Sequence, residues 1–232
     1  MRTDFHHRPM RSSFLSGGWR NAALLLILLP GSFGVFGCAT EGGSGNVVSE
    51  TRSVSGFSEV ALNGTGTLTI KRTGSESLTI EADDNVLPHI QTNVKNNRLT
   101  IETDDTTPIP TKPINYELTV KDLSAVELQG VGSIDASGIS TDELKVSTSG
   151  AGDMTVAGEA NSQEVDVSGA GSYRAQDLTT KKARVDLSGA GEAIVNVSDE
   201  LDVAISGFGS VEYVGNPTVS QNITGAGAVR RR

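Results

Sequence analysis

The chain is poor in cysteine, aromatic residues and positive charge. It has one cysteine in 232 residues, so an internal disulfide and paired-cysteine metal or redox sites are excluded. Aromatic residues make up 4% of the chain, against 27 glycines, which favours thin layers of aliphatic side chains over a core of large rings. The formal net charge of −9 opposes binding to a phosphate backbone, so no nucleic-acid partner is expected.

The apolar run AALLLILLP at 22–30 is too short to cross a bilayer as a helix, which requires about 20 apolar residues. The segment before it, residues 1–20, carries four arginines against one acid, Asp4. A basic segment followed by a short apolar core and small residues is typical of a secretory signal.

The signal ends in VFGC at 35–38, which resembles the lipobox of bacterial lipoproteins. The resemblance implies cleavage after Gly37, followed by attachment of a diacylglyceryl thioether and an acyl chain to Cys38. Each buried methylene of these chains adds about 0.8 kcal/mol of membrane affinity. Ala39, in place of an aspartate, implies delivery to an outer membrane where one exists. The alternative is an ordinary signal peptide in which Cys38 is incidental.

These segments predict three parts: a lipoprotein signal peptide at 1–37, a flexible tether at 38–45 and a single domain at 46–232. The sequence after the cysteine, ATEGGSGN at 39–46, has the small polar composition of a flexible linker. Within the domain, residues 46–125 are irregular and residues 126–232 are regular.

The regular part is built on a repeated glycine pair with one residue between the two glycines. From Gly130 onward, the first glycines follow one another at intervals of 18–20 residues. Positions two and four residues to either side are nearly all apolar, and the positions between them are mostly polar. Such alternation predicts strands, and a fixed interval of this size predicts stacked units. The pairs lie in NGTG at 63–66, QGVG at 129–132, SGAG at 149–152, 168–171 and 188–191, SGFG at 206–209 and TGAG at 224–227.

The pattern predicts an all-β fold, namely a right-handed parallel β-helix with about 18–20 residues per coil. Each unit should contribute two short strands, with neighbouring coils about 4.8 Å apart. Val165, Val185 and Val203 should then lie side by side. The glycines have two structural interpretations: both face the core and let the walls approach, or they form a corner with backbone angles that only glycine adopts. A phosphate loop is disfavoured, because no helix or lysine follows the pairs.

The irregular half shows the same alternation without the fixed interval. Its segments are GFSEVALNGTGTLTIKR at 56–72, SLTIEADDNVLPHIQTNVKNNRLTIETDD at 77–105 and INYELTVKDLSAVELQGVGSI at 114–134. In this order, and followed by the SGAG repeats, they resemble the bacterial "putative autotransporter adhesin, head GIN domain" family from about residue 54 to 228. The resemblance implies a right-handed β-helix, often on lipoproteins, and no agreed biochemical activity.

Few residues are candidates for chemistry. Asp166 and Asp186 both lie three residues before a first glycine, so they should be one coil apart on the outer face. Two such carboxylates could serve a hydrolase or a cation, but two solvated acids beside basic neighbours are the simpler interpretation. The pairs Asp83–Asp84 and Asp104–Asp105 suit turns, and His89 lacks a partner motif. No catalytic residue, metal ligand or cofactor is predicted.

Hydroxyl groups and small side chains form the regular outward pattern. A serine or threonine precedes each of the last five glycine pairs, and the residue between the glycines is mostly alanine. Stacked coils should therefore present ladders of hydroxyl and methyl groups, which suit a repetitive polymer or another protein but also suit a crowded wall without a ligand. The hydroxyl ladder consists of Ser149, Ser168, Ser188, Ser206 and Thr224.

Together these features predict a lipoprotein of the cell envelope, in the outer membrane where one exists, with a non-catalytic β-helical domain for adhesion, binding or a structural role. Its expected partners are the membrane, through the lipid on Cys38, and an envelope polysaccharide or protein. The alternative is a carbohydrate-active enzyme, a polysaccharide hydrolase or lyase, because β-helices include such enzymes.

Overall fold

The computed structural model describes residues 42–232, which form one unit of fifteen strands and one short 3-10 helix. The predicted signal peptide, Cys38 and the first tether residues lie outside the described residues. About five turns of a parallel β-solenoid make up most of the unit, which confirms the predicted all-β parallel β-helix. Among the described residues, no helix is long and apolar enough to cross a membrane.

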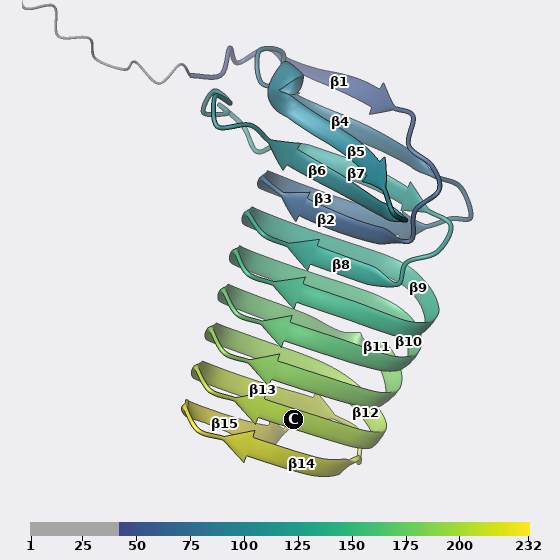
Figure 1. Cartoon of the computed structure of the whole chain (residues 1–232), viewed down its shortest axis with the longest axis vertical. Helices are drawn as coiled ribbons and strands as arrows, with labels where there is room; N and C mark the ends of the chain where they lie inside the picture. Colours follow the sequence, from purple (N-terminus) through teal and green to yellow (C-terminus); the bar gives the residue numbers. More distant parts are fainter. Residues whose placement is uncertain (1–41) are drawn as a thin grey trace, which may run out of the picture. The chain divides into compact units, whose positions relative to one another are not determined.

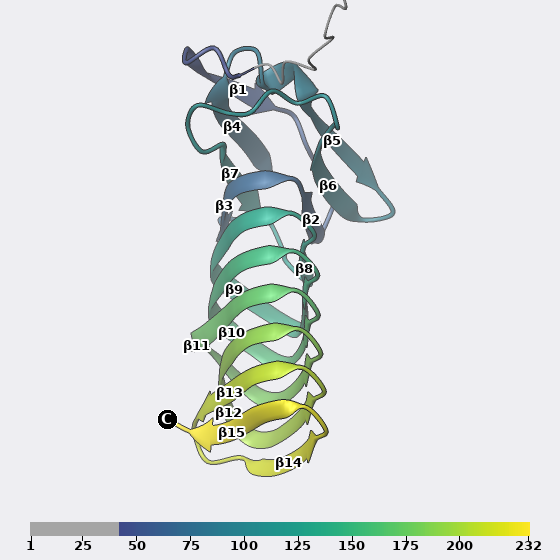
Figure 2. The ribbon, with the colours of Figure 1, turned by 90° about the vertical axis from the view of Figure 1, so that its left-hand side faces the viewer.

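The strands of the regular coils stack below one another along the solenoid (Figure 1). β9 to β12 each make a whole coil: the strand follows one wall, bends, and returns along the opposite wall (Figure 2). The two short strands predicted for each unit are thus joined into one bent strand, and they separate only in the last coil, as β13 and β14. The strands are β8 (Ala125–Leu128), β9 (Val131–Thr148), β10 (Ala151–Val167), β11 (Ala170–Leu187), β12 (Ala190–Ile205), β13 (Phe208–Val214), β14 (Thr218–Ile223) and β15 (Ala226–Arg231).

We name the parts of a coil by their place relative to the glycine pair. Wall A is the half-coil after the pair, wall B is the half-coil before the next pair, the glycine edge joins wall B to the next wall A, and the far edge is the bend opposite. On wall B, Val165 pairs with Val185 and Val185 with Val203, as predicted. Register shifts fall at the far edge, so the varying coil lengths are absorbed there and the glycines stay aligned.

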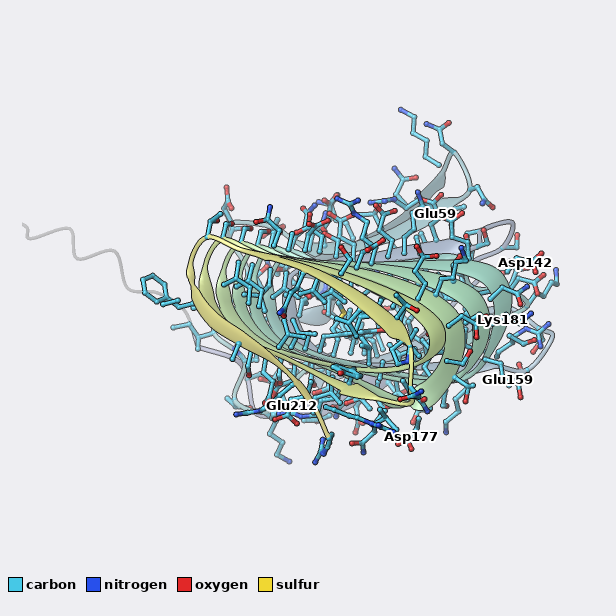
Figure 3. The ribbon with its side chains drawn as sticks, turned by 90° about the horizontal axis from the view of Figure 1, so that it is seen from below. Glu59, Asp142, Glu159, Asp177, Lys181 and Glu212 are labelled. Atoms are coloured by element: carbon cyan, nitrogen blue, oxygen red, sulfur yellow. The ribbon has the colours of Figure 1, made fainter. Side chains whose placement is uncertain are left out.

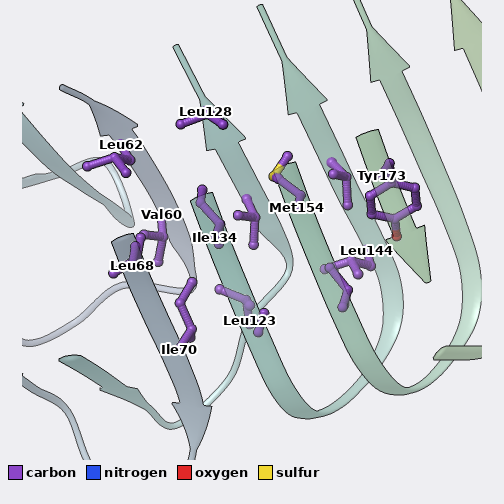
Figure 4. Packing of buried hydrophobic residues seen from close by; sticks show 14 of the residues in the cluster. Val60, Leu62, Leu68, Ile70, Leu123, Leu128, Ile134, Leu144, Met154 and Tyr173 are labelled. Carbon is purple, nitrogen blue, oxygen red and sulfur yellow. The ribbon is translucent and has the colours of Figure 1, made fainter. Parts of the chain in front are cut away.

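Inward side chains of the two walls meet in a narrow interior (Figure 3). Figure 4 shows this packing from close by; Leu62, Leu68 and Ile70 in it have no exposed surface. Each such side chain stabilises the fold by about 1.5–3 kcal/mol relative to exposure. The apolar residues of the alternating sequence pattern therefore face the interior, and the polar residues between them face the solvent.

A short polar chain crosses this aliphatic interior. The Tyr173 hydroxyl donates to Gln163 Oε1 at 2.9 Å, and Gln163 Nε2 donates to Thr180 Oγ1 at 3.1 Å. Thr180 in turn donates to the Asn196 carbonyl at 2.8 Å. Burial raises the pKa of Tyr173 far above its ordinary value. Tyr173, Gln163 and Thr180 are thus partnered, and these hydrogen bonds fix which side chains meet inside the coil.

The irregular half forms a cap at one end of the stack (Figure 1). On wall A, β3 pairs in parallel with β7. β7 then pairs with β4, and β4 with β1, both antiparallel. On wall B, β2 pairs with β6, which forms a hairpin with β5 through Asn96 and Asn97, both at positive φ. Asn96 and Asn97 thus form the turn of this hairpin. The cap elements are β1 (Val47–Arg52), β2 (Glu59–Asn63), β3 (Thr65–Arg72), β4 (Ser77–Asp83), η1 (Leu87–His89), β5 (Ile90–Lys95), β6 (Arg98–Thr103) and β7 (Asn115–Val120).

The repeated glycines lie at the corner between wall B and the next wall A, and a close approach of backbones explains them. A Cβ on Gly150 would lie 1.9 Å from the carbonyl oxygen of Gly130 in the preceding coil. The φ angle of Gly150 is not positive, and of the paired glycines only Gly66 has a positive φ. The corner was among the interpretations of the sequence, but the need for glycine comes from stacking along the solenoid rather than from the core or unusual backbone angles.

Candidate functional site

The glycine edge carries the predicted hydroxyl ladder. Ser149, Ser168, Ser188, Ser206 and Thr224 are all exposed there. The backbone beneath them is tightly paired: Ser168 N and Gly169 N both donate to the Thr148 carbonyl, at 2.9 and 3.0 Å. The hydroxyls and the residues between the glycines are therefore held at one strand spacing, about 4.8 Å. Whether this ladder binds a ligand stays a prediction.

The column between the glycines is less uniform than the sequence pattern suggests. Ala151, Ala170 and Ala190 are exposed and aligned in register. Val131 and Phe208 stand in the same column, with 63% and 72% of their surface exposed. The edge is thus a ridge of small groups with a larger apolar side chain near either end.

The acid pair is where the sequence places it. Asp166 and Asp186 are partners in neighbouring strands on the outer face of wall B. Asp186 accepts a hydrogen bond from Arg184 Nε at 3.0 Å, and this contact raises the pKa of Arg184. Both aspartates border a shallow hollow of about 330 Å³ on the wall. One acid is therefore neutralised by an ion pair, as the simpler interpretation expects.

One column of charges on wall B alternates in sign from coil to coil. Lys145, Glu164, Arg184 and Asp202 are successive partners in register. Lys145 Nζ lies 3.4 Å from Glu164 Oε2, which raises the pKa of the lysine. Exposed pairs of this kind contribute little to stability, because water and salt screen them. These ion pairs balance the charges of the side chains in this column of the wall.

The far edge holds a larger polar hollow of about 680 Å³ that the sequence did not reveal. Asp142, Glu159 and Lys181 lie along this edge (Figure 3). Within it, Asn161 Nδ2 donates to Asp142 Oδ1 at 2.7 Å. These residues come from the part of each coil whose length varies, so no fixed spacing marks them in the sequence.

In the cap, Asp83, Asp104 and His89 form hydrogen bonds or ion pairs with nearby residues. Asp104 accepts from the Thr106 hydroxyl at 2.7 Å and lies 3.1 Å from His89 Nδ1, and the Thr106 contact is the main reason its pKa is lowered. Asp83 is buried and accepts from Thr111 N at 2.7 Å. Within residues 42–232, no group of three or more acids, histidines or cysteines is arranged to hold a metal ion.

The comparisons with known proteins concern the same stretch of chain. The family model described as "Putative auto-transporter adhesin, head GIN domain" matches residues 56–217. A search of the curated proteins found no match to the chain.

Several solved structures share the fold. A putative adhesin from Bacteroides fragilis is 24% identical with a TM-score of 0.70, covering 82% of this chain and 99% of that chain. A putative adhesin from Parabacteroides merdae is 18% identical with a TM-score of 0.52, covering 82% and 98%. A "putative lipid binding protein" from Parabacteroides distasonis is 19% identical with a TM-score of 0.54, also covering 82% and 98%. At these identities the likeness establishes the fold alone.

Proposed function

Because the chain belongs to the "putative auto-transporter adhesin, head GIN domain" family, we propose that it is a non-catalytic binding protein of the cell envelope that docks through its glycine edge. The protein is exported and anchored by lipid on Cys38, in the outer membrane where one exists. Its partner is a repetitive envelope polysaccharide or a protein surface.

The alignment of the glycine edge is the observation that carries this proposal. The glycine pairs of successive coils are partners without a register shift, so hydroxyl and methyl groups repeat at one spacing along the edge. A ligand with its own regular repeat meets the same chemistry at each coil, and several weak contacts add to a useful affinity. The small side chains also have little rotamer freedom to lose on binding.

Paired lysine substitutions test the docking surface. Ala170→Lys with Ala190→Lys should weaken binding to arrayed bacterial surface glycans or envelope proteins at least tenfold, because two long side chains interrupt the ridge. The control is Gln176→Lys with Ser198→Lys, which adds the same charge to exposed positions of the same two coils away from that edge. Equal binding by both variants and the parent protein would remove the glycine edge as the docking surface.

The anchor is tested separately. The Cys38→Ser variant should lose incorporation of a palmitate analogue, since it lacks the thiol that forms the thioether. Unchanged incorporation would rule out Cys38 as the lipidated residue.

A carbohydrate-active enzyme is the second candidate, favoured by the register pairing of Asp166 and Asp186 beside the hollow on wall B. Hydrolysis of envelope polysaccharides by the purified protein, abolished by Asp166→Asn and not by Asp142→Asn, would establish it. The ion pair between Asp186 and Arg184 and the open wall favour the non-catalytic role.

A further inference from the structure

The segment that enters the domain is fastened to the cap from residue 42 onward. Gly42 forms a parallel bridge with Ile109, and Gly43 N donates to the Ile109 carbonyl at 2.7 Å. Asn46 Nδ2 donates to Asp84 Oδ2 at 2.8 Å, and Asn85 Nδ2 donates to the Gly42 carbonyl at 3.1 Å. This part of the expected tether moves with the cap.

The loop that receives this segment is itself held in place, yet it exposes an apolar side chain. Thr111 donates to the buried carboxylate of Asp83 through its backbone N–H at 2.7 Å and its hydroxyl at 2.9 Å. Pro108 is buried, while 62% of the surface of Ile109 is exposed and Lys112 is exposed close by. The loop therefore presents an isoleucine and a lysine to the surroundings without contributing them to the core.

The length of chain before residue 42 limits what those surroundings can be. Four peptide units connect Cys38 to Gly42, and they reach at most about 14 Å. A lipid on Cys38 thus keeps Gly42 within that distance of the membrane surface, and Ile109, its bridge partner, at most about 5 Å farther away. The membrane is therefore the partner that this loop meets at the highest effective concentration, in the millimolar range for so short a link.

We propose that the cap is the membrane-facing end of the domain, and that Ile109 and Lys112 contact the phospholipid surface. This inference rests on the proposed lipidation of Cys38. Ile109 enters the boundary between headgroups and acyl chains, and Lys112 pairs with a lipid phosphate. Asp105 on the neighbouring turn disfavours a strongly anionic surface, so the contact suits zwitterionic lipid. The coils then lead away from the membrane and leave the glycine edge open to a partner.

Fluorophore labelling of the lipidated full-length protein tests the orientation. A lipidated Cys38 is a thioether and takes no thiol reagent, so Ile109→Cys provides one labelling site for an NBD fluorophore. In phosphatidylcholine vesicles, we expect doxyl-labelled lipid to quench NBD at position 109 at least twofold. The same label at Ala170→Cys and Phe208→Cys, exposed positions on coils farther from the cap, should lose less than a tenth of its emission. Adding Lys112→Glu to Ile109→Cys should reduce the quenching.

The outcomes separate the two proposals. Labelling of the parent protein at Cys38, with no flotation alongside vesicles, would overturn the lipid anchor and the orientation with it. Flotation with equal quenching at positions 109 and 208 would overturn the membrane contact alone and leave the anchor standing. Stronger quenching at 208 than at 109 would invert the orientation.

Discussion

A single methyl group at the glycine edge should be among the most destabilising small changes in this protein. In Gly150→Ala, the new Cβ would lie 1.9 Å from the Gly130 oxygen and 2.9 Å from its carbonyl carbon. Both are backbone atoms, so no side chain can turn aside and the two coils must separate by more than an ångström.

The expected cost follows from what that separation breaks. Ala151 N donates to the Gly130 carbonyl at 3.0 Å, and Gly150 N donates to the Leu128 carbonyl at 3.3 Å. Overpacking costs about 1–3 kcal/mol, and the loss of these two bonds adds about 1–2 kcal/mol. We therefore expect Gly150→Ala to lower the free energy of unfolding by about 2–5 kcal/mol, a large part of the 5–15 kcal/mol typical of a domain.

Urea unfolding followed by circular dichroism measures this, since the only tryptophan, Trp19, lies in the predicted signal peptide. Gly56→Ala is the matched control. The φ angle of Gly56 is +79°, and no atom lies within 4 Å of the place that its methyl group would take. This variant should therefore lose about 1–2 kcal/mol of stability through the unfavourable backbone angle alone. Ala151→Asp, on the exposed column, should change stability by less than about 0.5 kcal/mol. The stacking argument fails if Gly150→Ala costs no more than Gly56→Ala.

Further predictions concern the interior and the cap. Tyr173→Phe should lower the free energy of urea unfolding by about 1–3 kcal/mol, because Gln163 Oε1 loses its hydrogen-bond donor. Combining Tyr173→Phe with Gln163→Leu should recover part of that loss. Full additivity of the two changes would contradict the proposed polar chain. The pKa of Glu76 is lowered from 4.5, mainly by the hydrogen bond from Lys121 Nζ at 2.7 Å, so its contribution to stability is present above pH 4.5 and is lost as the pH falls through the lower, folded-state pKa. Thermal unfolding between pH 6 and pH 3 should therefore decline less steeply in Glu76→Gln than in the parent protein, and parallel profiles would rule this carboxylate out. In the same measurements, Gly169→Val should be more destabilising than Gly150→Ala, because its Cβ would lie 1.9 Å from the Gly150 oxygen and carries two further methyl groups.

The regular coils could be predicted from the sequence because one local pattern repeats with one spacing. The alternation of apolar and polar residues predicted which side chains of wall B face inward. The fixed interval between glycine pairs predicted that Val165, Val185 and Val203 are neighbours. The same logic placed Asp166 beside Asp186 and aligned the serines of the glycine edge. It did not reveal why the pairs are glycine, because the clash lies between coils rather than within one.

The cap and the far edge could not be predicted in the same way. Alternation in residues 77–103 indicates strands but not that β4 pairs antiparallel with β7 and β1, since pairing partners depend on contacts distant in sequence. The hollow near Asp142 and Lys181 arises where coil lengths differ, so it has no spacing to recognise. The fastening of Gly42 to Ile109 joins a small-residue segment to a proline-rich loop, two stretches whose composition indicates flexibility.

The division between a constant corner and a variable bend makes the solenoid modular. A whole turn, such as residues 150–168, begins and ends at equivalent points of the repeat, so its removal would join Ser149 to Gly169 and restore the SGAG motif. The stack would shorten by about 4.8 Å, one strand spacing, with each remaining turn keeping the same kind of neighbour. Evolution can thus set the reach of such a protein by gene duplication or deletion of one repeat, without inventing a new core.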